Sequence, residues 1–151
     1  MARNIYYVGL LTLLLCKSHT IFAANCFEYT DLYADNVICQ YGDFYNPYSR
    51  TGVINGRHTI MTNKTAKDRN TNNKLSIVPI GEDMSVRLGN EYTGAQAEAI
   101  TYIIDVDTLN FQLLYLKYAV VLENPNHSKQ EQPRFTLEIL DKNGKKEAGL
   151  G

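Results

Sequence analysis

The chain has 151 residues, of which 15 are basic and 16 acidic, and hydrophobic residues make up 44% of it. This length fits a single domain. The near-neutral charge includes no basic cluster that would neutralise phosphates, so it gives no reason to expect binding to nucleic acid or to an anionic membrane surface.

The amino terminus has the pattern of an export signal peptide. One positive charge, Arg3, precedes the apolar run Ile5–Cys16, and the small pair Ala23-Ala24 follows a short polar stretch. As a helix this run would be about 18 Å long, against a hydrocarbon core of about 30 Å, so a membrane anchor is the weaker interpretation. We expect residues 1–23 to be a signal-peptide helix that is removed after Ala23 or Ala24. A single exported domain, residues 24–151, would remain without a transmembrane anchor, outside the cell, at its surface or in the periplasm.

Export also affects how the cysteines are interpreted. Cys16 would leave with the signal peptide, and Cys26 and Cys39 would remain as an even pair in an oxidising compartment. A bridge across their 13-residue separation would stabilise the fold by about 3 kcal/mol in the chain-entropy model. We predict this disulfide; the alternatives are two free thiols, or partners outside this chain. Neither Cys16 nor Cys26 follows a small residue, so a lipid-anchor signal is not expected.

An aromatic-rich segment follows the signal. Asp, Asn, Gly and Pro residues interrupt it, which predicts a loop with short extended pieces. Its densest part contains Tyr41, Phe44, Tyr45 and Tyr48. Two interpretations are open: the four rings form a surface on which a sugar stacks, or they pack over the edge of a sheet.

The rest of the chain consists of short runs in which apolar and polar residues alternate, as is typical of antiparallel strands. We expect strands over Gly56–Thr62, Leu75–Pro79, Met84–Leu88, Ala97–Val106, Phe111–Glu123 and Arg134–Leu140, the last with Phe135, Leu137 and Ile139 inward. The polar stretch Asn63–Lys74 is expected to be a solvated loop, and Asp107–Asn110 and Asp141–Gly144 are expected to be hairpin turns.

The expected strands define the fold class as all-β, an antiparallel β-sandwich of the jelly-roll kind, with no helix after the signal peptide. After the Asn-Gly turn at Asn143-Gly144, the chain ends in Lys145–Gly151, which has no β pattern. The strand Arg134–Leu140 would then lack a neighbour, and its backbone groups would be unpaired. We therefore expect an incomplete domain, truncated at its C-terminus; the alternative is an edge strand with a frayed tail.

Charged residues within or beside the strands are expected to form structural ion pairs. Arg87 lies among apolar neighbours, and a pair with Glu98 across a sheet would make its half-buried charge tolerable. Glu123, His127 and Arg134 flank one loop. They could form a ligand or metal site, but cross-strand ion pairs and loop anchors are the more usual role of such residues.

No recognisable catalytic motif accompanies these residues. Neither His58 nor His127 has a nucleophile close by in the sequence. Asp83, Asp105 and Asp107 could supply oxygen ligands to a structural calcium ion, but their spacing matches no calcium-loop motif. We predict no cofactor and no catalytic residues.

Six different short motifs follow one another along Gly56–Leu140. They are Gly56-Arg57-His58, Val86-Arg87-Leu88-Gly89-Asn90, Ala97–Tyr102 (AEAITY), Tyr118–Glu123 (YAVVLE), Pro125 with His127, and Gln132–Phe135 (QPRF). In these motifs the chain resembles the amino-terminal β-sandwich region of large, multi-domain Bacteroidota surface proteins of the PKD-domain and gliding-motility-associated kind. The resemblance implies a jelly-roll module used in adhesion, with a glycan or a cell-surface protein as partner and no catalytic residues. That family's pattern continues with further strands and cysteines, which supports truncation and means that Cys26 or Cys39 could have a partner outside this chain.

The sequence therefore predicts an exported, non-enzymatic β-sandwich module of a cell-surface or adhesion protein. One alternative is an accessory domain or fragment of a secreted hydrolase, which two carboxylates about 5–9 Å apart in a cleft would support. A purely structural spacer is another.

Overall fold

Strands make up the ordered framework of the computed structural model, which describes residues 7–16, 27–28, 31–92, 94–105 and 113–146. The two helices among these residues are single 3-10 turns. In chain order the elements are β1 (Tyr7–Cys16), β2 (Phe27–Glu28), β3 (Val37–Asp43), β4 (Arg50–Thr51), β5 (His58–Met61), η1 (Arg69–Thr71), β6 (Ser85–Leu88), β7 (Gln96–Tyr102), β8 (Leu113–Leu122) and η2 (Lys129–Glu131).

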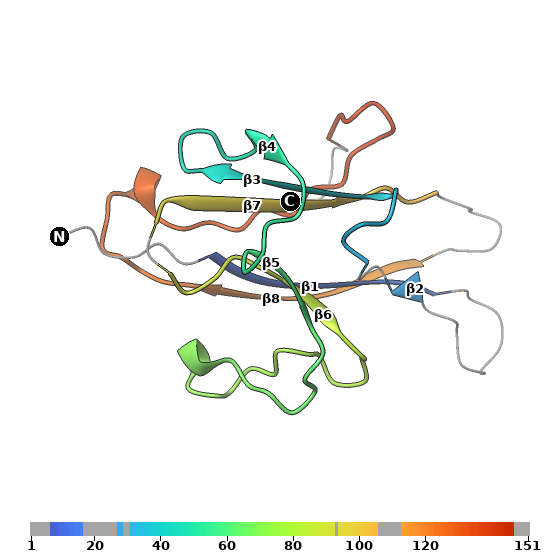
Figure 1. Cartoon of the computed structure of the whole chain (residues 1–151), viewed down its shortest axis with the longest axis horizontal. Helices are drawn as coiled ribbons and strands as arrows, with labels where there is room; N and C mark the ends of the chain where they lie inside the picture. The colour runs from blue at the N-terminus through green and yellow to red at the C-terminus, as the bar shows by residue number, and fades with distance from the viewer. Residues whose placement is uncertain (1–6, 17–26, 29–30, 93, 106–112, 147–151) are drawn as a thin grey trace.

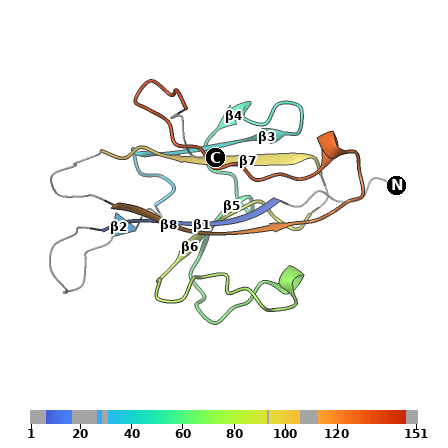
Figure 2. The ribbon, with the colours of Figure 1, turned by 180° about the vertical axis from the view of Figure 1, so that it is seen from behind.

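The strands form two sheets that face each other (Figure 1; Figure 2 shows the same layers from behind). One sheet has five strands, in which β2, β1, β6 and β5 follow one another and β8 pairs with β1. The other has the order β4-β3-β7. Every strand pair is antiparallel. The prediction of an all-β, antiparallel fold is confirmed.

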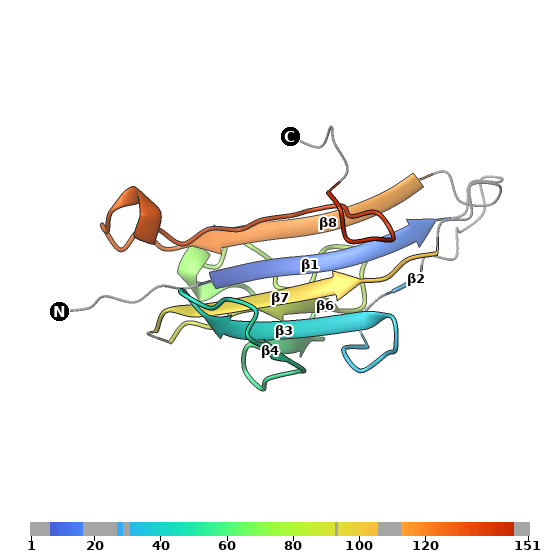
Figure 3. The same ribbon diagram turned by 90° about the horizontal axis from the view of Figure 1, so that it is seen from above.

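The five-stranded sheet is built around β1. This strand pairs with β8 over ten residues, from Tyr7 opposite Leu122 to Cys16 opposite Leu113. Figure 3 shows β8 and β1 lying side by side. The sequence predicted a signal-peptide helix over residues 1–23, and the structure describes Tyr7–Cys16 of this stretch as strand β1. A short apolar run fits a buried strand as well as a helix, and periodicity alone does not separate the two. Residues 1–6 and 17–26 of the expected signal lie outside the described part.

The three-stranded sheet has β3 at its centre. Strand β3 pairs with β7 along its whole length, from Val37 opposite Tyr102 to Asp43 opposite Gln96, and with the short strand β4 on its other edge. Sequence patterning predicted β7 and β8 as hairpin neighbours, but the structure puts them in different sheets. Residues 106–112, which contain the expected turn, lie outside the described residues.

Four of the six expected strands are confirmed, with changed ends, as β5, β6, β7 and β8. Leu75–Pro79 is not a strand: it has only an isolated bridge between Ser76 and Lys67. The hydroxyl of Ser85 donates to the carbonyl of Ile77 at 2.6 Å, so a side chain takes a bond that a neighbouring strand would otherwise make. This segment still packs inward, because Val78 is buried.

Arg134–Leu140 was also predicted as a strand, and this was wrong. It contains one isolated bridge, between Leu140 and Lys146. The segment runs along β8 (Figure 3), where Phe135 stacks on Tyr118 with ring centroids 5.7 Å apart. Leu137 and Ile139 are exposed and do not point inward as expected. Alternation alone does not make a strand when the backbone forms no ladder with a neighbouring segment, and here the described residues form only that one bridge.

The buried core lies between the two sheets. Val37 and Cys39 of β3 and Val86 of β6 form its centre together with Leu32. Val37 and Cys39 are two residues apart, so both side chains point to the same face of β3.

Candidate functional site

The most distinctive surface feature is the connection from β3 to β4, residues Asp43–Ser49, which we call the aromatic loop. It lies at one end of the three-stranded sheet (Figure 1). Tyr45 and Tyr48 are 84% and 55% exposed. Phe44 is half-buried, and its ring meets that of Tyr45 edge to face at 5.3 Å. The loop thus presents two tyrosine rings to solvent above a packed aromatic neighbour.

Backbone hydrogen bonds fix the aromatic loop. A carboxylate oxygen of Asp43 accepts from the backbone N–H of Tyr45 at 2.9 Å and of Asn46 at 2.8 Å. Aspartate commonly stabilises turns in this way, because its short side chain reaches the N–H groups of the next residues. The N–H of Phe44 donates to the carbonyl of Ala95 at 2.7 Å, which ties the loop to the segment before β7.

The loop also folds tightly over Gly42. A Cβ atom at this position would lie 1.9 Å from the carbonyl oxygen of Asn46. Real atoms do not approach this closely, so only glycine is compatible with this loop conformation. The tyrosines are therefore carried on a fixed backbone.

Beneath the loop, Tyr41 lies against two arginines. The guanidinium carbons of Arg57 and Arg50 are 5.6 and 5.9 Å from the centre of its ring. Such cation–π contacts are worth about 0.5–1 kcal/mol at exposed sites and more when water is excluded. Tyr41 is half-buried, so it supports the base of the loop, whereas Tyr45 and Tyr48 make its exposed surface.

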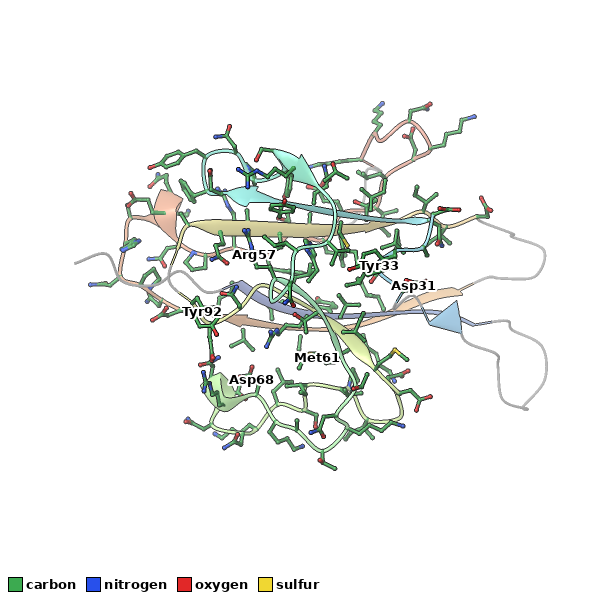
Figure 4. All side chains as sticks on the ribbon, viewed as in Figure 1. Asp31, Tyr33, Arg57, Met61, Asp68 and Tyr92 are labelled. Atoms are coloured by element: carbon green, nitrogen blue, oxygen red, sulfur yellow. The ribbon has the colours of Figure 1, made fainter. Side chains whose placement is uncertain are left out.

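Arg57 is the polar centre of this end of the sandwich, between the two sheets (Figure 4). Its Nε atom donates to the carboxylate of Glu98. A terminal nitrogen of its guanidinium donates to the carbonyls of Gly42 and Ala97, each at 2.9 Å. The Glu98 side chain is only 1% exposed. Burial raises the pKa of Glu98, and the bond from Arg57 opposes that rise.

His58, the next residue, joins the two sheets. Its Nδ1 accepts from the N–H of Ile54 at 3.2 Å, and its Nε2 lies 3.2 Å from the carbonyl oxygen of Ala99 in β7. A carbonyl can only accept, so Nε2 carries the proton and donates. Burial lowers the pKa of His58, and this outweighs the hydrogen bond to Ala99, which acts in the opposite direction. The neutral ring thus accepts one hydrogen bond from Ile54, before β5, and donates one to Ala99 in β7.

The structure places the predicted ion-pair residues differently from expectation. Glu98 is paired, but its partner is Arg57 and not Arg87. The Nε atom of Arg87 is buried without a hydrogen-bond partner. Both arginines lie in or beside predicted strands, and nothing in the sequence distinguishes which one faces Glu98. A glutamate between two alanines in an apolar strand was the signal that a buried partner was needed.

Glu123, His127 and Arg134 were expected to pair or to form a ligand site. One carboxylate oxygen of Glu123 is buried without a hydrogen-bond partner. The backbone carbonyl of His127 accepts from the side chain of Gln132 at 2.8 Å, and Arg134 is exposed. The ion pairs found among the described residues do not include these three.

The predicted disulfide between Cys26 and Cys39 is not seen in the structure. Cys39 is a buried free thiol, and Cys26 lies outside the described residues. Burial raises the pKa of the Cys39 thiol. The pKa of the nearby Tyr102 hydroxyl is also raised, first by burial and then by its proximity to Cys39.

The described candidate calcium ligands do not form a calcium site. Asp83 is exposed and bonds Lys64, which lowers the pKa of its carboxyl. Asp105 is exposed, and Asp107 lies outside the described residues. Among residues that the structure describes, no group of three or more His, Cys, Asp or Glu side chains is placed to hold a metal ion.

A second, more apolar surface lies along β8. A shallow depression of about 260 Å³ separates this strand from the loop before β6, with Leu75, Pro79 and Ile80 on one side and Lys117–Ala119 on the other. Ile80 is almost fully exposed at its rim. The depression lacks the convergent polar groups that fix a small ligand, so we prefer the aromatic loop as the candidate site.

No helix within the described ranges has the length and apolar character needed to cross a bilayer. Comparisons with known protein families, with curated proteins and with solved structures found no match to this chain.

Proposed function

We propose that this chain is an exported, non-catalytic β-sandwich module of a cell-surface or adhesion protein, which binds glycan through the aromatic loop. One observation carries the proposal: Tyr45 and Tyr48 are exposed on a backbone that Asp43 and Gly42 hold in place. A tyrosine ring combines an apolar face with a hydroxyl, so it suits a ligand that also has apolar faces and hydroxyl groups. A loop held in one conformation loses little entropy when it binds.

Two further observations favour binding over catalysis. The buried titratable groups nearest the loop already have structural roles, because Glu98 bonds Arg57 and both ring nitrogens of His58 engage backbone groups. The resemblance to amino-terminal β-sandwich regions of Bacteroidota surface proteins points to the same class of adhesion module. Export itself rests on the charged, apolar and small-residue order of the first 24 residues.

The proposal is tested by glycan-array binding of the purified exported chain, followed by titration of the best ligand against three variants. Tyr45→Ala and Tyr48→Ala should each weaken binding about fivefold, since an aromatic contact is worth about 1 kcal/mol. Tyr33→Ala is the matched control. Tyr33 is 80% exposed and lies at the opposite end of the sandwich (Figure 4), so its removal should leave affinity unchanged.

Equal losses in all three variants, or none in the loop variants, would refute the aromatic loop as the binding surface. Cleavage of an array glycan by the purified chain would instead favour the alternative, a fragment or accessory domain of a secreted hydrolase. Binding to a cell-surface protein through the same two tyrosines would retain the site and change the class of ligand.

A further inference from the structure

Strand β1 is the central element of the five-stranded sheet. One of its edges pairs with β8 over ten residues. Its other edge pairs with β6, where Gly9, Leu10 and Leu11 lie opposite Leu88, Arg87 and Val86, and then with β2 at Leu14 and Leu15. No ladder joins β8 directly to β6 among the described pairings. These two strands belong to one sheet only because β1 lies between them.

The residues of β1 are also the apolar run of the predicted signal peptide. Cleavage after Ala23 or Ala24 would remove this strand from the exported chain. It would leave backbone N–H and C=O groups unpaired along the facing edges of β8 and β6, which is costly if they are also shielded from water. Neighbouring strands lie about 4.7–4.9 Å apart, so the space left is about 9–10 Å wide and fits one strand.

Direct pairing of β8 with β6 across the space left by β1 is unfavourable. Because β8 and β6 are both antiparallel to β1, they run parallel to each other. Parallel pairing is slightly weaker per residue, and β6 has only four residues to offer along the ten of β8. A strand that runs antiparallel to both restores the ladders that the structure shows.

We propose that the slot between β8 and β6 is a strand-binding site, which in the exported chain takes an extended apolar segment of about ten residues from another protein. This inference rests on the proposed function, because removal of the signal creates the slot. A second copy of this chain is an unsuitable donor, since its own Tyr7–Cys16 segment leaves with the same cleavage. Addition of a strand from a partner is an established mode of recognition, in which main-chain hydrogen bonds give affinity and side chains give specificity.

The pairing of β1 defines the chemistry that the slot accepts. The run YVGLLTLLLC has no charge and no proline, and its single polar residue is Thr12. In the register, Thr12 lies opposite Lys117 of β8. Lys117 bonds Glu82 and is partly buried, so one charged pair borders a slot whose other side includes the fully buried Val86. The expected partner strand is apolar, with a small polar residue beside Lys117.

The full chain provides the test. A protease site replaces residues 18–22, and the folded protein is cut there, so that the first segment stays bound only by its pairing. A fluorescent peptide of Tyr7–Cys16 sequence, with lysines added at both ends for solubility, is then offered in excess. The expected result is exchange of the peptide into the nicked protein, measured by fluorescence anisotropy.

The control peptide carries Leu11→Pro, at the position that pairs with both Tyr118 and Val86. Proline removes a ladder hydrogen bond and is excluded from central strands, so the proline peptide should bind about 10- to 100-fold more weakly. A second peptide, Leu11→Val, should bind as the parent does. No uptake of the parent peptide, or equal uptake of the proline peptide, would overturn the proposal.

The position at which the exported protein begins distinguishes a failure of the strand-binding site from a failure of the proposed export. Intact-mass analysis should show a chain that begins at Ala24 or Asn25. If the chain begins there but takes up no peptide, the strand-binding site is refuted and the proposal of export still holds. If the secreted chain keeps Tyr7–Cys16, the signal peptide is not removed and no slot for a partner strand is created. Strand β1 would then be a permanent part of the fold.

Discussion

Arg57 and Glu98 form a buried ion pair that joins the two sheets beneath the aromatic loop. Arg57 directly precedes β5, and Glu98 lies in β7. The same guanidinium bonds the carbonyl of Gly42, at the start of the loop, and stacks on Tyr41. One side chain therefore holds the end of the sandwich and the base of the proposed binding surface together.

Breaking this pair should be costly. Arg57→Gln leaves the Glu98 carboxylate, which is 1% exposed, buried without a counter-charge, and such a change typically destabilises a protein by about 3–5 kcal/mol. Urea unfolding measures the loss. Lys64→Gln, which breaks the exposed pair with Asp83, is the control and should change the stability far less, because water screens an exposed pair. Equal effects of the two substitutions would show that Arg57 has no special structural role.

Gly42→Ala should disrupt the aromatic loop. The new methyl group would meet the carbonyl oxygen of Asn46, so the loop must move, at a cost of about 1–3 kcal/mol. Limited chymotrypsin digestion reports the change, because the protease cuts after exposed tyrosines in mobile segments. Cleavage after Tyr45 and Tyr48 should accelerate while cleavage after Tyr33 does not. An unchanged digestion pattern would mean that the loop tolerates a side chain at this position.

His58 should make stability depend on pH. Burial lowers the pKa of His58 below its usual value of 6.5, so the unfolded chain binds the proton more tightly than the folded one. Its contribution is complete above pH about 6.5 and is lost as the pH falls through the folded-state pKa, by at most about 1.4 kcal/mol per pH unit.

The comparison for this pH effect is His58→Asn, which cannot titrate. The variant should be less stable than the wild type at pH 7.5, by about 1–3 kcal/mol, because a buried backbone group loses its partner. The difference between the two proteins should shrink as the pH falls from about 6.5 towards the folded-state pKa of His58, and it should stay constant below that pKa. Glu98 is present in both proteins, so its own titration cancels. A difference that is independent of pH would contradict a buried neutral imidazole.

Cys39 should behave as a protected free thiol. It is buried, and burial raises its pKa, so the reactive thiolate is scarce and shielded. In a variant with Cys16 and Cys26 replaced by serine, alkylation by iodoacetamide should be at least about 100-fold slower in the folded protein than in urea. The wild-type exported protein provides the opposing test. A non-reduced intact mass short of two hydrogens would establish the Cys26–Cys39 disulfide instead.

Local pattern predicted the elements better than their partners. Alternation located β5, β6, β7 and β8 because the period of two depends on residues close in sequence. It did not indicate that β7 pairs with β3, over 50 residues earlier, since many partners satisfy the same alternation. It also failed for Arg134–Leu140, where the apolar residues are correct for a strand but the described residues form one isolated bridge and no ladder.

The candidate site was also predicted only in part. The cluster of Tyr41, Phe44, Tyr45 and Tyr48 was visible in the sequence, with two interpretations, an exposed binding surface or packing over a sheet edge. Exposure and packing each hold for two of the four residues. Tyr41 and Phe44 pack against their surroundings, and Tyr45 and Tyr48 face solvent. The support from Arg57 depends on a contact between two sheets, and the sequence analysis predicted Arg87 as the partner of Glu98 instead.

The position of Glu98 has a consequence for how the molecule avoids self-association. In the order β4-β3-β7, strand β7 is the edge strand among the described residues. An apolar edge invites another chain to add to it and aggregate, and a charged side chain directed inward discourages this addition. In the β7 sequence QAEAITY, Glu98 is the one charged side chain. We therefore expect Glu98, besides pairing with Arg57, to disfavour the addition of another chain at β7.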